Sequence, residues 1–292
     1  MTADTLRIVT WNIQWGRGCD GRVDLDRIVS VIREWGDVDV VMLQEAADGF
    51  ADLPGHDGSD QFAALASRFA GYAFVDATGV EVAGAGTRRR RFGNAIATRL
   101  PVQQVWRHLL PWPADPAAPS MQRVALETCL ATPFGPLRAT TTHLEFYSRP
   151  QRAAQVRRLR ELHAEAVQHA RTPRRGEREH GPFVPMPRGA LAVLAGDMNC
   201  TADSEELRAL LAPHGDGTPA YRDAWACLHG TSAHPPTVGI HDREQWPDGS
   251  KTFDFFLVGE DLAPRVRAVE VNTATDASDH QPMLLTLDAR AG

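Results

Sequence analysis

The sequence has almost no lysine and no long apolar run. Lys251 is the only lysine among 31 basic residues in a chain of 292 residues, so we interpret the arginine excess as compositional bias rather than as chemistry. No apolar run approaches the ~18 residues that a membrane-spanning helix needs, and the N-terminus has no charged segment followed by an apolar one. The sequence therefore predicts a cytoplasmic protein without a membrane span.

Cysteine spacing and net charge limit the function further. None of the four cysteines is in CxxC spacing, so neither a zinc ribbon nor a redox pair is indicated; they are Cys19, Cys129, Cys200 and Cys227. A formal net charge of -6 argues against a surface that grips nucleic acid over its whole extent, although a local basic groove stays open. The 43% hydrophobic content supports a large core, and no linker divides the chain. We expect a single domain over residues 1–292.

Short apolar runs alternate with a few helical patterns. Runs of strand length, most of them bounded by polar or turn-forming residues, lie at 6–10, 38–44, 94–98, 124–129, 137–142, 191–195, 253–258, 266–271 and 283–287. Helical patterns lie at 23–35, 61–69, 149–170 and 205–211. Strands that follow one another directly, mixed with strand–helix–strand units, predict a two-sheet α/β architecture with helices on the outer faces. The Gly- and Arg-rich segments 79–91 and 171–189 are predicted to be loop insertions.

Polar side chains recur where apolar strands end. This is where an α/β protein places its site, because the strand is rigid and the following loop is free. The residues that follow strands are Asn12, Glu45, His143, Asp197 and Asn199, and they are joined by Asp254 inside a strand and by Asp279 and His280 before the last strand. Most of them have a simpler explanation as a turn former, a cap or a core histidine. Asp254 is harder to explain in that way, since a carboxylate between Phe253 and Phe255 needs a partner if it is buried, and His280 could provide one.

Carboxylates without a Cys/His cage suit a hard cation such as Mg²⁺ or Mn²⁺. A further carboxylate can orient an attacking water, and amides with a protonated histidine can neutralise a charged transition state. An Asp–His pair fixes the imidazole tautomer and favours its charged form. These groups together are what a phosphodiesterase or phosphomonoesterase requires.

The order of the short motifs resembles that of the endonuclease/exonuclease/phosphatase (deoxyribonuclease I-like) superfamily. The matches cover nearly the whole chain and are Thr10-Trp11-Asn12-Ile13, Leu43-Gln44-Glu45, Gly93-Asn94-Ala95-Ile96, Thr142-His143-Leu144, Gly196-Asp197-Met198-Asn199, Phe253-Asp254-Phe255 and Ser278-Asp279-His280. The resemblance implies a four-layer α/β sandwich, in which two mixed β-sheets pack face to face and helices flank them.

The resemblance also implies roles for the strand-end residues. Glu45 would be the main metal ligand, with Asn12 and Asp279 nearby, and the cofactor would be Mg²⁺ or Mn²⁺. Asp197 would orient or deprotonate the attacking water, and Asn199 would hold a phosphate oxygen. His280, paired with Asp254, and His143 on the opposite side would stabilise charge at the phosphate.

Departures from the family pattern concern the substrate. Gln14 stands where abasic-site endonucleases have a second metal-binding carboxylate, which weakens that assignment. Four arginines run into Gly93-Asn94 and are expected at the rim of the cleft, where Arg91 would meet substrate phosphates; the alternative is a solvated loop. Arg123 and Asn94 are further candidates for substrate binding.

Three functions remain open. The first is a divalent-metal-dependent phosphoesterase in which water attacks the phosphorus in line, with DNA or RNA slightly favoured as substrate. The second is a phosphodiesterase or phosphatase acting on a small molecule or a lipid headgroup, like a sphingomyelinase. The third is a catalytically inactive binding module on the same scaffold. No obligate protein partner is indicated.

Overall fold

Two six-stranded sheets form the centre of the computed structural model, which describes residues 4–172 and 181–290. The first sheet has the order β11-β12-β1-β2-β4-β3, formed by β1 (Thr5–Asn12), β2 (Val40–Asp48), β3 (Ala73–Ala83), β4 (Arg89–Thr98), β11 (Val266–Val271) and β12 (Met283–Asp288). The second has the order β5-β6-β7-β8-β10-β9, formed by β5 (Val102–Leu109), β6 (Val124–Thr132), β7 (Gly135–His143), β8 (Leu191–Asp197), β9 (Tyr221–Asp223) and β10 (Asp254–Gly259).

Both sheets are mixed, because each has one parallel pair among antiparallel neighbours. The parallel pairs are β1 with β2 and β7 with β8. The helices are α1 (Leu25–Glu34), α2 (Gln61–Arg68), α3 (Arg149–Arg171), α4 (Glu205–Leu211) and α5 (Ala224–His229), with short 3₁₀ turns at Gln14–Gly16, Gly181–Phe183 and Ala263–Arg265. None of the helices in the described part of the chain is long and apolar enough to cross a membrane.

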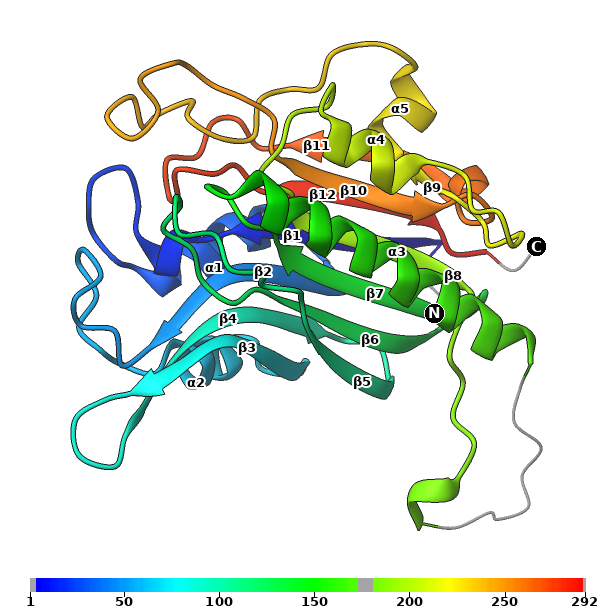
Figure 1. Ribbon diagram of the computed structural model, residues 1–292, viewed down its shortest axis with the longest axis horizontal. Helices are drawn as coiled ribbons and strands as arrows, with labels where there is room; N and C mark the ends of the chain where they lie inside the picture. Colours follow the sequence, from blue (N-terminus) through cyan, green and yellow to red (C-terminus); the bar gives the residue numbers. More distant parts are fainter. Residues whose placement is uncertain (1–3, 173–180, 291–292) are drawn as a thin grey trace.

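Three apolar clusters separate four layers. The largest lies between the sheets and includes Ile8, Met42, Leu126 and Phe256. A second cluster packs α1 and α2 against the first sheet, and a third packs α3 and α4 against the second. Figure 1 shows α3 lying along the outer face of β7 and β8. The predicted four-layer α/β sandwich is therefore confirmed.

Local sequence explains where the predicted helices begin. The carboxylate of Asp24 accepts hydrogen bonds from two backbone N–H groups in the first turn of α1, and the hydroxyl of Ser148 does the same once for α3. A proline in the first turn of α3 needs no hydrogen-bond partner for its nitrogen. All four predicted helices are present.

Within the segment predicted as a loop at 79–91, only residues 84–88 lie outside a strand. Residues 79–83 belong to β3 and residues 89–91 to β4, and the two strands form a hairpin in which Glu81 pairs with Arg91 and Val82 with Arg90. The sequence did not reveal this hairpin because the parts of its strands within 79–91 are intermediate or exposed and contain no apolar run. The segment predicted as a loop at 171–189 begins at the last residue of α3 and includes the turn Gly181–Phe183, while its residues 173–180 lie outside the described residues. The single-domain assignment of residues 1–292 stays a prediction.

Candidate active site

The strand ends that carry the polar motifs lie at one end of the sandwich. Loops after β1 and β2, the hairpin of β3 and β4, and the loops before β10 and β12 gather at the left of Figure 1. A cavity of about 570 Å³ opens there. Six of the predicted catalytic and metal-binding residues line it, namely Glu45, His143, Asp197, Asn199, Asp279 and His280.

Asp197 is at the centre of the polar cluster. Its Oδ2 accepts a hydrogen bond from Asn12 Nδ2 at 3.1 Å and lies 3.4 Å from Nε2 of His143. Its Oδ1 accepts the backbone N–H of Asn199 at 2.9 Å. Asp197 ends β8, and Gly196 precedes it with a φ of +133°, a conformation that leaves no room for a side chain beside the backbone of β7.

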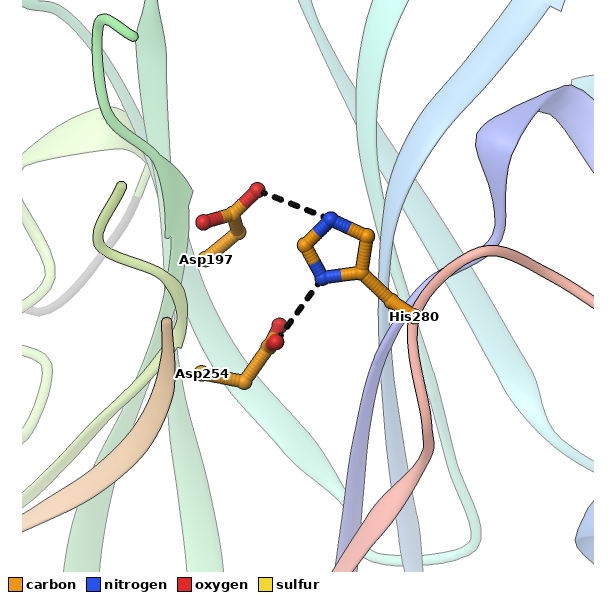
Figure 2. Close-up of side chains that lie close together, drawn as sticks. All are labelled: Asp197, Asp254 and His280. Carbon is orange, nitrogen blue, oxygen red and sulfur yellow. Dashed lines mark hydrogen bonds and ion pairs between the residues drawn. The ribbon is translucent and has the colours of Figure 1, made fainter. Parts of the chain in front are cut away.

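His280 bridges the two sheets, as Figure 2 shows. Its Nδ1 donates to Oδ2 of Asp254 at 2.8 Å, and its Nε2 lies 3.6 Å from Oδ2 of Asp197. The hydroxyl of Thr237 donates to the same oxygen of Asp254 at 2.7 Å. The predicted Asp254–His280 pair is thus present, and Asp254 is almost fully buried.

Burial and charge separate the protonation states of the site. Burial opposes a charge on His280, but Asp254 and Asp197 outweigh it and hold the pKa of His280 well above its usual range. Burial, with Arg123 and His280 nearby, holds the pKa of His143 well below its usual range. Burial raises the pKa of Asp197 to about 7. At neutral pH one imidazole is therefore charged, the other is neutral, and the carboxylate between them is able to take up a proton.

A bulge aims Glu45 into the cavity. Between the pairs Leu43–Ala95 and Ala46–Gly93, β2 has one residue more than β4, and Glu45 adopts a φ of +63° there. Among the described residues, positive φ outside glycine occurs at Gln14, Trp15, Glu45 and Asn199, and all four line the cavity. Backbone strain of this kind persists only where the surrounding structure fixes it, and it is concentrated at functional sites.

Glu45 and Asp279 fit a divalent cation. Both line the cavity, and after burial the negative charge of Asp279 is the main influence that raises the pKa of Glu45. A cation between two such carboxylates would relieve their repulsion, and oxygen donors suit Mg²⁺ or Mn²⁺. Asn12 fits less directly, because its amide oxygen accepts the backbone N–H of Gln14 while its Nδ2 donates to Glu45 at 3.0 Å. Its assignment as a metal ligand stays a prediction.

Asp197, Asp254 and His280 also lie close enough to hold a metal, with ligand atoms within 4.8 Å of one another. A cation at that position would have to break the 2.8 Å hydrogen bond between His280 and Asp254. Oδ2 of Asp254 already accepts from Thr237 as well. The hydrogen-bonded arrangement therefore favours an acid–base chain at these three residues and a metal at Glu45 and Asp279.

Of the three predicted substrate-binding residues, Arg123 lines the cavity. Its side chain is almost buried and pairs with Glu145 at 3.2 Å, while its Nη1 has no hydrogen-bond partner within the described residues. A buried, unpartnered guanidinium nitrogen beside a cavity is well suited to a phosphate oxygen.

Arg91 and Asn94 are placed differently. Arg91 pairs with Asp48 and Asp60, each at 3.0 Å, and is not among the residues lining the cavity. Nδ2 of Asn94 donates to the backbone oxygen of Val124 at 2.9 Å, which joins the two sheets below the cavity. Their assignment to substrate binding stays a prediction, and the observed contacts give both residues a structural role.

The sequence analysis did not identify the aromatic residues of the cavity. Phe146 and Tyr147 lie three and four residues after His143, and Trp246 lies in the loop before β10. The indole N–H of Trp246 donates to Oδ2 of Asp279 at 3.2 Å. The available signal was the pair of adjacent aromatics after a strand-end histidine; nothing in the local sequence marked Trp246.

Together the layers and the cleft define a two-sheet α/β sandwich with carboxylates and histidines at one end. A family model described as "Endonuclease/Exonuclease/phosphatase family" matches residues 9–280. The chain belongs to this family, whose members are generally phosphoester hydrolases dependent on divalent metals. No curated protein sequence matches the chain.

Solved structures agree in fold. An endonuclease/exonuclease/phosphatase from Beutenbergia cavernae is 24% identical, with a TM-score of 0.65, over 99% of this chain and 72% of that one. A protein of the same description from Bacteroides vulgatus is 17% identical, with a TM-score of 0.66, over 99% and 100% of the two chains. A mannosyl-6-phosphatase from Bacteroides thetaiotaomicron is 14% identical, with a TM-score of 0.64, over 96% and 98%. At these identities the likeness shows the fold alone.

Proposed function

We propose that the protein is a divalent-metal-dependent phosphoesterase that directs a water molecule at the phosphorus of its substrate. The observation that carries the proposal is the placement of Asp197. It lies between an imidazole held neutral and an imidazole held charged, in the cavity that Glu45 and Asp279 also line. Acid, base and charge-neutralising groups thus converge on one space of a few ångströms.

The residues around the cavity divide the reaction between them in this proposal. Asp197 orients the water and takes its proton, for which its raised pKa suits it. His280, charged because of Asp254, donates to a phosphate oxygen. His143, Asn199 and Arg123 hold the other oxygens. A cation bound by Glu45 and Asp279 would supply positive charge to the phosphate and the leaving oxygen.

The contacts of the four arginines at 88–91 bear on whether the substrate is a nucleic acid or a smaller molecule. Arg88 and Arg91 pair with Asp48, and Arg91 pairs with Asp60 as well. Arg89 pairs with Glu81, and Arg90 with Asp52. Paired arginines add little to a field that attracts a polyanion. We therefore favour a small-molecule or lipid-headgroup substrate over DNA or RNA, although the sequence alone slightly favoured DNA or RNA. The mannosyl-6-phosphatase of the same fold is named for a small phosphate ester.

Metal removal tests the proposal. Hydrolysis of bis-p-nitrophenyl phosphate should require Mg²⁺ or Mn²⁺, stop with EDTA and return when the metal is restored. Glu45→Gln should weaken Mn²⁺ binding in calorimetry by at least tenfold, and the exposed Glu161→Gln should not. Undiminished hydrolysis in chelator would overturn the metal dependence. Absence of both metal binding and turnover would favour the inactive binding module. A cytoplasmic location stays a prediction.

A further inference from the structure

Arginine and lysine side chains are scarce in the cavity. Arg123 is the only arginine or lysine among the described residues that line it. One of its nitrogens is engaged by Glu145, which leaves a second nitrogen for a ligand. A single cationic side chain can hold one phosphate, but a strand of nucleic acid is gripped through several phosphates at once.

One wall of the cavity is aromatic and exposed. Phe146 contacts Tyr147 edge to face with ring centres 4.8 Å apart, and contacts Trp246 in the same way at 5.9 Å. The exposed fraction is 39% for Phe146 and 62% for Tyr147. Trp246 also lies edge-on to His280 at 6.3 Å, so this wall is continuous with the proposed catalytic residues.

A second wall of the cavity is apolar as well. It includes Trp15, Phe50, Leu53, Val80 and Phe92. Phe50 and Phe92 contact edge to face with centres 6.3 Å apart. These residues come from the loops after β1 and β2 and from the hairpin of β3 and β4, whereas the first wall comes from loops of the second sheet.

Aromatic rings thus lie on both walls beside the polar residues of the cavity, Glu45, Asp197, Asp279 and His280, which form its floor. Water in such a space gains little from its walls, and an apolar group that replaces it contributes roughly 25 cal/mol for each Å² it buries. A hydrophilic alcohol attached to the phosphate would forfeit this gain and would lose its own hydration without receiving hydrogen bonds from the apolar side chains of the walls.

We propose that the substrate is a compact phosphate ester with a bulky apolar group on its ester oxygen, bound between these two walls while Arg123 and the floor hold the phosphate. The inference rests on the proposed function and adds the substrate class to it. An aromatic ring and an alkyl chain share this chemistry, and the experiment separates them.

Calorimetry with non-hydrolysable phosphonates tests the class directly. With Mn²⁺ present, benzylphosphonate or octylphosphonate should bind about 10- to 100-fold more tightly than methylphosphonate. The larger of the two gains shows whether the walls favour a ring or a chain. Equal affinities for all three would overturn the inference, and so would tighter binding of a 20-base-pair DNA duplex than of either apolar phosphonate.

Substitutions in the two walls test whether these residues cause the preference for apolar phosphonates. Tyr147→Ala and Leu53→Ala each remove apolar surface from one wall and should reduce the ratio of benzyl- to methylphosphonate affinity by about three- to tenfold. Leu109→Ala is the control, because Leu109 is 62% exposed, like Tyr147, but does not line the cavity. An unchanged ratio in both wall variants would overturn the assignment of the walls.

Calorimetry and the hydrolysis assay together distinguish the substrate class from the phosphoesterase function. Intact metal-dependent hydrolysis with no preference among the phosphonates overturns the substrate class and leaves the phosphoesterase function in place. A clear preference for apolar phosphonates without hydrolysis of any ester supports the walls as the binding surface and overturns the catalytic function.

Discussion

At the residue scale, the candidate site is a chain of polar contacts between side chains that are far apart in the sequence. The chain runs through Thr237, Asp254, His280, Asp197, Asn12 and Glu45. Each member fixes the orientation or the charge of the next one, as the pKa directions of His280 and Asp197 indicate. Substitutions within this chain should therefore combine non-additively.

Removal of the proposed base or acid should abolish most of the activity. Asp197→Asn and His280→Ala should each lower turnover by roughly 10²-fold or more, because proton transfer and charge neutralisation are lost while the apolar clusters are untouched. Steady-state kinetics measures the loss, and circular dichroism checks the fold. The exposed Asp203→Asn serves as the control. Near-normal rates in both site variants would contradict the assignment.

Trp246 is expected to position Asp279. Trp246→Phe keeps a ring beside Phe146 but removes the donor to Oδ2 of Asp279, so Mn²⁺ affinity should fall by about 10-fold or more. Calorimetric titration with Mn²⁺ measures this change. Trp225→Phe is the matched control, since its indole donates to the backbone oxygen of Ser232 instead. If both variants bind Mn²⁺ equally well, the hydrogen bond does not position the carboxylate.

At the scale of the elements, sequence patterns found the inner strands and missed three of the four edge strands. The strands without a prediction are β3, β5 and β9, and each lies at the end of a sheet. An edge strand is partly exposed, so its residues need not be apolar, and β5 is intermediate or exposed along its whole length. The inner strands β1, β2, β7, β8 and β10 are covered on both faces and form the apolar runs that the sequence analysis used.

Close contact between β3 and β4 depends on Gly93. A Cβ at this position would lie 2.0 Å from the backbone oxygen of Ala77, and Gly93 also pairs with Ala46 beside the bulge at Glu45. Gly93→Ala should lower the free energy of unfolding by roughly 1–3 kcal/mol. Urea denaturation measures this effect. Gly215→Ala, where a Cβ meets nothing within 4 Å, should change it by about 0.5 kcal/mol or less. Equal stabilities of the two variants would contradict the steric argument.

At the scale of the whole molecule, polar contacts join the two sheets beneath the site. The side-chain amide of Gln44 on β2 donates to Thr10 at 3.1 Å and to Thr141 on β7 at 2.8 Å. The indole of Trp11 donates to the backbone oxygen of His280 at 2.9 Å. The site takes Glu45 and His280 from the first sheet and its connections, and Asp197 and Asp254 from the second. Its geometry therefore depends on how the two sheets pack.

A buried histidine of α3 should make the free energy of unfolding depend on pH. Nδ1 of His163 accepts from Arg138 at 2.7 Å and its Nε2 donates to the backbone oxygen of Pro219 at 2.9 Å, which fits the neutral ring. Burial, with Arg138 nearby, lowers the pKa of His163 to about 3. Below its ordinary value of 6.5 the unfolded chain binds a proton that the folded chain does not, so acidification destabilises the fold.

The expected contribution of His163 is a loss of up to about 1.4 kcal/mol per pH unit as the pH falls from 6.5 towards 5. Urea unfolding across this range measures the slope for the protein and for His163→Gln, which does not titrate. The variant should be less stable at neutral pH. Its free energy of unfolding should also change less steeply with pH, by the contribution of about one bound proton. Identical slopes would show that His163 does not contribute to the pH dependence of stability.

The sequence by itself determined the type and order of the inner elements, because apolar periodicity follows directly from burial. Motif order also identified the residues that come together, among them Glu45, Asp197 and His280. Only the tertiary structure decided which contacts these side chains and the arginine run make, since contacts between distant residues leave no local pattern. Pairing of β2 with β4 within the first sheet set Arg91 beside Asp48, and Arg91 also contacts Asp60. The fold also placed apolar walls beside the proposed catalytic residues.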